Sequence, residues 1–187
     1  MPKKAFLIHG WQGHPEEEWR PWLRNELESL GWKVILPAMP DTMHPKVHEW
    51  VRHTEHLVNI TGGPDENCYF VGHSLGCIAI LRYLETLSNE KVGGAILVAG
   101  FSDDLGYEEF LNFFTAPILW DEIKTHCKKF VAIHSDNDPY VPLEQGNVFK
   151  EKLGAELIIE HNMKHYSADD GITELPIALE VLLRISE

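Results

Sequence analysis

Residues 72–76 read GHSLG, a G-x-S-x-G pattern, and they lie between an apolar segment typical of a buried strand (67–71) and a helical pattern (77–87). A serine on a sharp turn from a strand into a helix points its hydroxyl out of the sheet, and flanking glycines avoid Cβ clashes in that turn. The stretch therefore predicts a nucleophile elbow at Ser74 rather than a purely structural turn. The backbone N–H of Leu75 then lies at a helix N-terminus, where it faces a developing negative charge.

Apolar runs alternate with helical patterns along the chain. Strands are expected at residues 4–8, 33–36, 68–71, 94–98, 130–134 and 157–160, and helices at 19–30, 47–59, 75–87, 142–153 and 175–185. This alternation is typical of a parallel sheet covered by helices on both faces, with right-handed crossovers. We therefore expect residues 1–187 to form a single α/β domain. Its fold would be a three-layer αβα sandwich with a mostly parallel six-stranded sheet and its chemistry at the carboxyl ends of the strands.

Composition narrows the function classes. Lys and Arg total 16 against 29 Asp and Glu, so the formal net charge is −13, which disfavours nucleic-acid and anionic membrane partners. Cys68, Cys77 and Cys127 have no C-x-x-C spacing, which argues against a disulfide framework or a zinc ribbon. The first apolar run is too short for a signal peptide, and no run is long enough to span a membrane, so a cytoplasmic location is expected.

Neither a metal nor a nucleotide cofactor is indicated. Four histidines (His44, His48, His53 and His56) are close in sequence, but they lack the H-E-x-x-H arrangement. No G-x-G-x-x-G or P-loop pattern is present. The three glutamates at 16–18 are interpreted as negative charge at a helix start.

A serine hydroxyl is a weak nucleophile near neutral pH, so Ser74 needs a base, and the base needs an orienting acid. The acid candidate is Asp138, because a strand ends at His134 and a polar turn follows it. A carboxylate in this turn lies just beyond the end of a strand, where it is positioned to accept a hydrogen bond from an imidazole. Asp136 is the alternative, and it equally suits a cap of the turn or of the next helix.

The base candidate is His165, which follows the last expected strand and precedes the last helix. His161 is the alternative and lies nearer the strand; a loop that returns over the sheet edge to Ser74 favours the later position. The chain order serine, acid, histidine is that of α/β hydrolases. His165 would take the serine proton and deliver it to a leaving group, while Asp138 would fix its tautomer.

Two further segments are expected at the same edge. Residues 9–14 read HGWQGH after the first strand, and a turn there brings the backbone N–H of Trp11 beside the elbow as a second oxyanion donor. Residues 101–120 are irregular and rich in aromatics. They form either a small cap that walls the substrate site or an ordinary helix packed into the core.

Together these residues resemble the small serine hydrolase family typified by retinoblastoma-binding protein nine and its bacterial relatives. The resemblance rests on segments 9–10 (HG), 19–23 (WRPWL), 72–76 (GHSLG), 120–124 (WDEIK) with Cys127, 138–142 (DPYVP) and on His165. It implies a minimal α/β-hydrolase fold with the triad on Ser74, Asp138 and His165, and ester or peptide-type hydrolysis.

Two departures from the family pattern matter. Residues 61–68 read TGGPDENC and lack the L-x-C-x-E motif of the retinoblastoma-binding member, so binding to the retinoblastoma protein is not expected. The family's catalytic histidine often follows glycine, whereas His165 follows Lys164.

The leading hypothesis is a metal-independent serine hydrolase that acts on a small acyl ester or amide. The alternative is a non-catalytic protein-interaction module on a hydrolase scaffold, since a fold does not determine a function. Acyl transfer to an acceptor other than water would use the same residues.

Overall fold

The sheet at the centre of the molecule has six strands, and every neighbouring pair is parallel. The structure is a computed structural model and describes residues 2–187, so Met1 of the expected 1–187 domain lies outside the described residues. The strand order is β2-β1-β3-β4-β5-β6. The strands are β1 (Lys4–Ile8), β2 (Lys33–Ile35), β3 (Cys68–His73), β4 (Gly94–Val98), β5 (Phe130–Ser135) and β6 (Glu156–Glu160).

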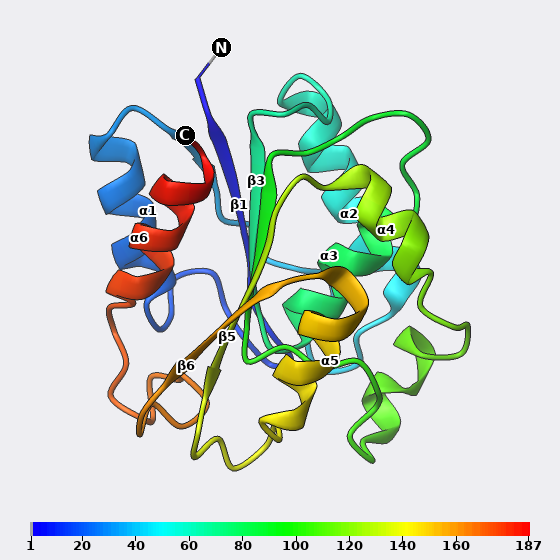
Figure 1. Cartoon of the computed structure of the whole chain (residues 1–187), viewed down its shortest axis with the longest axis vertical. Helices are drawn as coiled ribbons and strands as arrows, with labels where there is room; N and C mark the ends of the chain where they lie inside the picture. Colours follow the sequence, from blue (N-terminus) through cyan, green and yellow to red (C-terminus); the bar gives the residue numbers. More distant parts are fainter. Residues whose placement is uncertain (1) are drawn as a thin grey trace.

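Helices cover both faces of this sheet (Figure 1). Helices α1 (Arg20–Ser29) and α6 (Pro176–Ile185) lie together on one face. The opposite face carries α2 (Val47–Ile60), α3 (Leu75–Leu84), α4 (Trp120–His126) and α5 (Glu144–Leu153). The expected three-layer αβα sandwich is therefore confirmed, and its sheet is entirely parallel.

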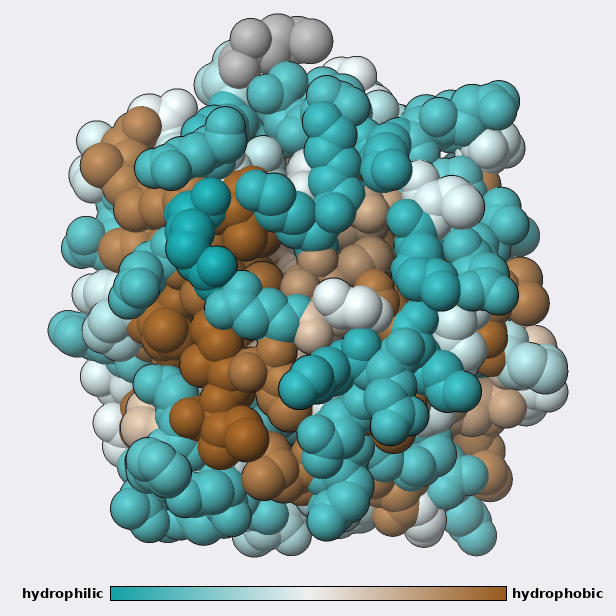
Figure 2. All heavy atoms as spheres, in the orientation of Figure 1, coloured by the Kyte–Doolittle hydropathy of each residue, from teal (hydrophilic) through white to brown (hydrophobic). Residues whose placement is uncertain are grey.

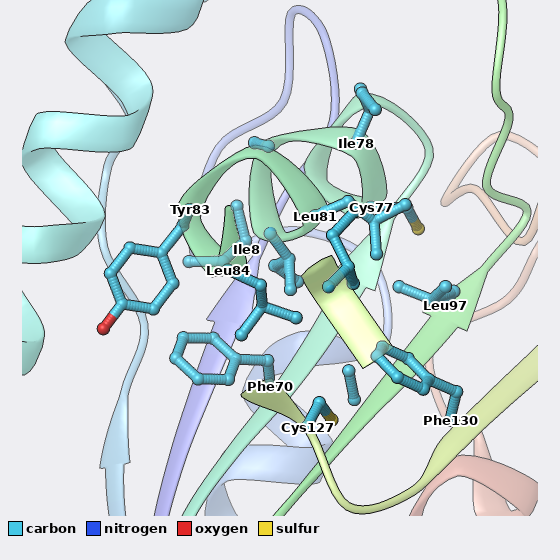
Figure 3. Packing of buried hydrophobic residues seen from close by; sticks show 14 of the residues in the cluster. Ile8, Phe70, Cys77, Ile78, Leu81, Tyr83, Leu84, Leu97, Cys127 and Phe130 are labelled. Atoms are coloured by element: carbon cyan, nitrogen blue, oxygen red, sulfur yellow. The ribbon is translucent and has the colours of Figure 1, made fainter. Parts of the chain in front are cut away.

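The larger of two hydrophobic cores lies beneath α3. All ten residues of this helix are buried, and Figure 3 shows Leu81 and Leu84 packed in one cluster with Ile8 and Phe70 of the sheet. Removing one such aliphatic side chain from water contributes about 1.5–3 kcal/mol. Because α3 begins directly after Ser74, this packing also fixes the position of the turn that carries Ser74.

Hydrophilic residues cover much of the face shown in Figure 2, and hydrophobic residues appear between them mainly on the side where α6 and β6 lie. Among residues 2–187, no helix combines the length and apolar character needed to cross a membrane.

The elements match the expected ones to within three residues at each end, with two exceptions. Helix α4 was not predicted, and the aromatic segment contains a short 3₁₀ helix, η1 (Glu108–Phe113). Strand β3 also runs to His73, two residues beyond its predicted end, so Ser74 follows the strand directly.

Close backbone packing at the elbow requires glycine. A Cβ on Gly76 would lie 2.8 Å from the carbonyl oxygen of His9 and nearer still to that of Ile8. The first turn of α3 therefore rests directly on the end of β1, without an intervening side chain. This contact brings the loop after β1 next to Ser74.

We predict that Gly76→Ala destabilises the protein strongly, because the backbone oxygens of β1 cannot move aside for a methyl group. Overpacking of this kind costs about 1–3 kcal/mol or more. Chemical denaturation with a spectroscopic readout measures the change. Gly31→Ala is the control: a Cβ added there would have nothing within 4 Å, so its loss should be confined to the roughly 1–2 kcal/mol cost of a side chain at its left-handed φ of 82°. Equal losses for the two variants would contradict the steric explanation.

Candidate active site

Ser74 occupies a strained backbone conformation between β3 and α3. Its φ of 53° and ψ of −122° lie in a region that non-glycine residues rarely adopt. Such strain persists only where the surroundings enforce it, and it clusters at functional sites. A serine on a strained strand-to-helix turn is the geometry of a nucleophile elbow.

The loop after β1 lies against this serine. A Cβ on Gly10 would be 3.0 Å from Cβ and 3.5 Å from Oγ of Ser74. Trp11, whose N–H is the predicted second oxyanion donor, follows Gly10 directly in this loop. Leu75 is the first residue of α3, so its N–H has no acceptor within the helix. Among residues 2–187, the N–H groups of Trp11 and Leu75 have no backbone acceptor either.

His9 anchors this loop through hydrogen bonds of both ring nitrogens. Its Nδ1–H donates to the carbonyl oxygen of Gly10 at 2.8 Å, and its Nε2 accepts the N–H of Met39 at 3.0 Å. One nitrogen donates and the other accepts, so these contacts require the neutral ring. Burial lowers the pKa of His9 to about 4, which agrees with a neutral structural histidine.

The structure brings Asp138 and His165 together. The Nδ1–H of His165 donates to Oδ2 of Asp138 at 2.8 Å, and the Asp138 side chain is 2% exposed. The other carboxylate oxygen of Asp138 accepts the backbone N–H groups of Tyr140 and Val141 at 2.9 and 3.0 Å. The carboxylate is therefore held by its own turn while it orients the imidazole.

The two alternative residues also pair, but with each other. Nδ1 of His161 lies 2.6 Å from Oδ2 of Asp136, and the His161 side chain is 81% exposed. This pair and the N–H of Asn162 lower the pKa of Asp136. It joins the loop after β6 to the loop after β5 at the surface and does not line the cavity that contains Ser74.

Ser74 and His165 line one cavity of about 290 Å³ at the carboxyl edge of the sheet. The hydrogen bonds of residues 2–187 do not include one between Ser74 Oγ and His165 Nε2, a contact that is often loose before substrate binds. The Nδ1 contact leaves Nε2 available for the serine proton.

The aromatic segment at residues 101–120 combines features of the two alternatives, a cavity wall and a part of the core. Phe101 and Phe110 are buried and stacked, with ring centroids 5.3 Å apart. The same two rings line the cavity with Tyr107, and the Trp11 ring packs edge-on against Phe110. The segment is therefore both part of the core and a wall of the cavity.

Sequence reasoning missed one group near Ser74. Glu18 does not lie in the first turn of a helix, because α1 begins at Arg20. Its carboxylate is largely buried and contacts both Arg20 and His73. No local pattern signals this cluster, because His73 is far from Glu18 in the sequence and reaches it only through the fold.

The four histidines at positions 44, 48, 53 and 56 do not form a metal-binding group in the structure. Across residues 2–187, no group of three or more His, Cys, Asp or Glu side chains is arranged to hold a metal ion. His44 and His48 are exposed, at 73% and 65% of their side-chain surface.

Comparison with known proteins agrees with this geometry. The model of the serine hydrolase family matches residues 5–184. YdeN of Bacillus subtilis (strain 168) is 34% identical over 190 residues, which cover 97% of this chain and 95% of YdeN. Serine hydrolase RBBP9 of Rattus norvegicus is 31% identical over 161 residues, with 83% of each chain covered. The chain therefore belongs to the serine hydrolase family, and it is a hydrolase enzyme.

Solved structures extend the comparison to the fold. The crystal structure of the ydeN gene product from B. subtilis has a TM-score of 0.91 and 32% identity, covering 98% of both chains. Est1E from Butyrivibrio proteoclasticus has a TM-score of 0.77 at 17% identity, covering 98% of this chain and 88% of Est1E. The latter likeness concerns the fold alone, which is that of α/β hydrolases.

We predict that His9 makes the protein less stable as the pH falls from about 6.5 toward 4. The pKa of His9 is lower in the folded chain than the ordinary 6.5, so the unfolded chain binds the proton first. Stability from this group is complete above pH 6.5 and declines by about 3 kcal/mol as the pH falls to 4. Unfolding free energies measured at several pH values give the slope.

His9→Gln should flatten this slope, because glutamine does not titrate. His48→Gln is the control and should leave the slope unchanged, since His48 is exposed. An unaltered slope in His9→Gln would show that other groups cause the acid sensitivity.

Proposed function

We propose that the protein hydrolyses small carboxylic esters or amides through an acyl-enzyme on Ser74, with His165 as general base and acid and Asp138 as its orienting group. The observation that supports this most is the hydrogen bond from His165, which lines the same cavity as Ser74, to the buried carboxylate of Asp138. Membership of the serine hydrolase family agrees with it. The exposed Asp136–His161 pair is not part of this mechanism.

The reaction proceeds in two halves. Ser74 Oγ attacks the acyl carbonyl while His165 Nε2 removes its proton, and the resulting oxyanion accepts hydrogen bonds from the N–H groups of Leu75 and Trp11. His165 then protonates the leaving alcohol or amine, which departs from the tetrahedral intermediate. A water molecule, deprotonated by His165, attacks the acyl-enzyme, and collapse of the second intermediate releases the acid and restores Ser74.

The cavity lining indicates the substrate class. Its side chains include several aromatic rings and the carboxylates of Glu18 and Asp169, but no lysine or arginine. A carboxylate on the acyl group would meet the carboxylate of Asp169 and no lysine or arginine of the lining, because Arg20 and His73 are already engaged by Glu18. A volume of about 290 Å³ is at the small end of ligand sites. We therefore propose a neutral, short or compact acyl group as the preferred substrate.

We predict that Ser74→Ala reduces kcat by a factor on the order of 10⁴ to 10⁶ and abolishes labelling by a fluorophosphonate. In His165→Ala, kcat should fall by a similar factor. In Asp138→Asn, kcat should fall about 10⁴-fold, because the amide favours the wrong imidazole tautomer. The matched controls are His161→Ala and Asp136→Asn, which should retain nearly full turnover of a p-nitrophenyl ester. Normal activity in Ser74→Ala, or equal losses in Asp136→Asn and Asp138→Asn, would overturn the assignment.

We also predict that kcat/KM for p-nitrophenyl esters is highest for short neutral acyl chains and falls for long chains and for a succinyl monoester. Tyr107→Ala should raise the relative kcat/KM for longer chains, because Tyr107 lines the cavity. Leu111→Ala is the control from the neighbouring 3₁₀ helix, as Leu111 is exposed and does not line the cavity. A preference for the succinyl ester over the butyryl ester would contradict the charge argument.

A further inference from the structure

His73, which immediately precedes Ser74, holds the backbone of His165. Its ring is 3% exposed, and its Nε2–H donates to the carbonyl oxygen of His165 at 2.8 Å. The two imidazole rings lie 5.0 Å apart between centroids. The strand that positions the serine thus also fastens the segment that carries the proposed base.

The second ring nitrogen of His73 contacts Glu18. Nδ1 lies 3.1 Å from Oε2 of Glu18, whose side chain is 14% exposed. The carbonyl oxygen of His165 and the carboxylate of Glu18 therefore contact the two nitrogens of one ring, so the orientation of that ring is set from both ends.

Glu18 is itself anchored at the start of α1. Arg20, which is completely buried, forms an ion pair with Glu18 and donates from Nη2 to the carbonyl oxygen of His14 at 2.8 Å. Burial acts to raise the pKa of Glu18, but His73 and Arg20 outweigh it and lower the value to about 2. Glu18 is therefore an ionised partner for His73, and the Trp19 ring packs edge-on against that imidazole.

The loop that carries His165 requires such an anchor. Asn162, Lys164 and Tyr166 have φ values of 61°, 49° and 57°, a conformation that favours glycine. The backbone of this segment is therefore strained on both sides of His165, and strain persists only where contacts enforce it. The N–H of His165 is held by Asp170 at 3.2 Å, and its carbonyl oxygen is held by His73.

We propose that His73 and Glu18 are positioning residues for His165, with Glu18 orienting the His73 ring so that its Nε2–H fixes the carbonyl oxygen of His165. Asp138 orients the imidazole through its ring nitrogen, whereas His73 sets where the backbone places that ring. This inference rests on the proposed role of His165 as the base. Loss of the anchor lowers kcat while KM for a neutral ester changes little, because Glu18 and His73 line the cavity outside its aromatic wall and act on the base.

The test compares His73→Gln with His73→Asn. The glutamine amide reaches about as far as Nε2 and keeps a donor toward His165. The asparagine amide reaches only about as far as Nδ1, on the Glu18 side. We expect His73→Gln to retain kcat within about tenfold, while His73→Asn loses about 10²-fold, the scale of a misplacement near 1 Å. KM should stay within about threefold for both.

A second pair examines Glu18. In Glu18→Gln the amide donates to Nδ1 of a neutral His73, which leaves its Nε2–H for His165, so most of kcat should remain. Glu18→Leu has no group that orients the ring and should resemble His73→Asn. This pair decides the question if a His73 variant fails to fold, and thermal unfolding monitored by circular dichroism establishes folding for each protein.

The outcomes separate this inference from the proposed function. Wild-type protein that neither turns over esters nor is labelled at Ser74 would refute the proposed function. If the wild type is active but folded His73→Asn or Glu18→Leu is equally active, only the positioning role is wrong. Equal kcat losses in His73→Gln and His73→Asn, or a change confined to KM, would also overturn it.

Discussion

The contact on which the site depends is the direct packing of the first turn of α3 onto the end of β1. Gly76 has no side chain to separate the two backbones, and Gly10, in the loop after β1, lies close to Ser74. The end of β1 and its loop therefore hold the turn of Ser74 in its strained conformation. The same contact places the two proposed oxyanion donors, since Trp11 is next to Gly10 and Leu75 is next to Ser74.

The sequence predicted the fold well because periodicity and chain direction carry most of that information. Buried parallel strands read as short apolar runs, as residues 94–98 do, and the helices between them have a different period. Ser74, Asp138 and His165 could be selected because a parallel sheet gathers strand ends at one edge. Helix α4 was missed because it has only seven residues, and a short segment contains too few turns for a periodic pattern.

The choice between paired alternatives was harder to make from the sequence, and the structure shows why. Asp136 and His161 form an ion pair of the same chemical type as Asp138 and His165, only a few residues away in each loop. Burial distinguishes the pairs: the Asp138 carboxylate is enclosed, while His161 is mostly exposed. Lys164, which stands where the family often has glycine, adopts the left-handed conformation that glycine favours.

Three histidines lie close to Ser74, and their partners assign each a different task. His9 donates to one backbone group and accepts from another, so in its neutral form it stabilises the loop after β1. His73 faces two acceptors, which occupy both of its nitrogens. His165 has one nitrogen committed to Asp138, and its other nitrogen is free to exchange a proton. Since a general base must have an uncommitted nitrogen, the hydrogen-bond partners support the proposed role of His165 over the other two histidines, which nearness to Ser74 along the chain could not do.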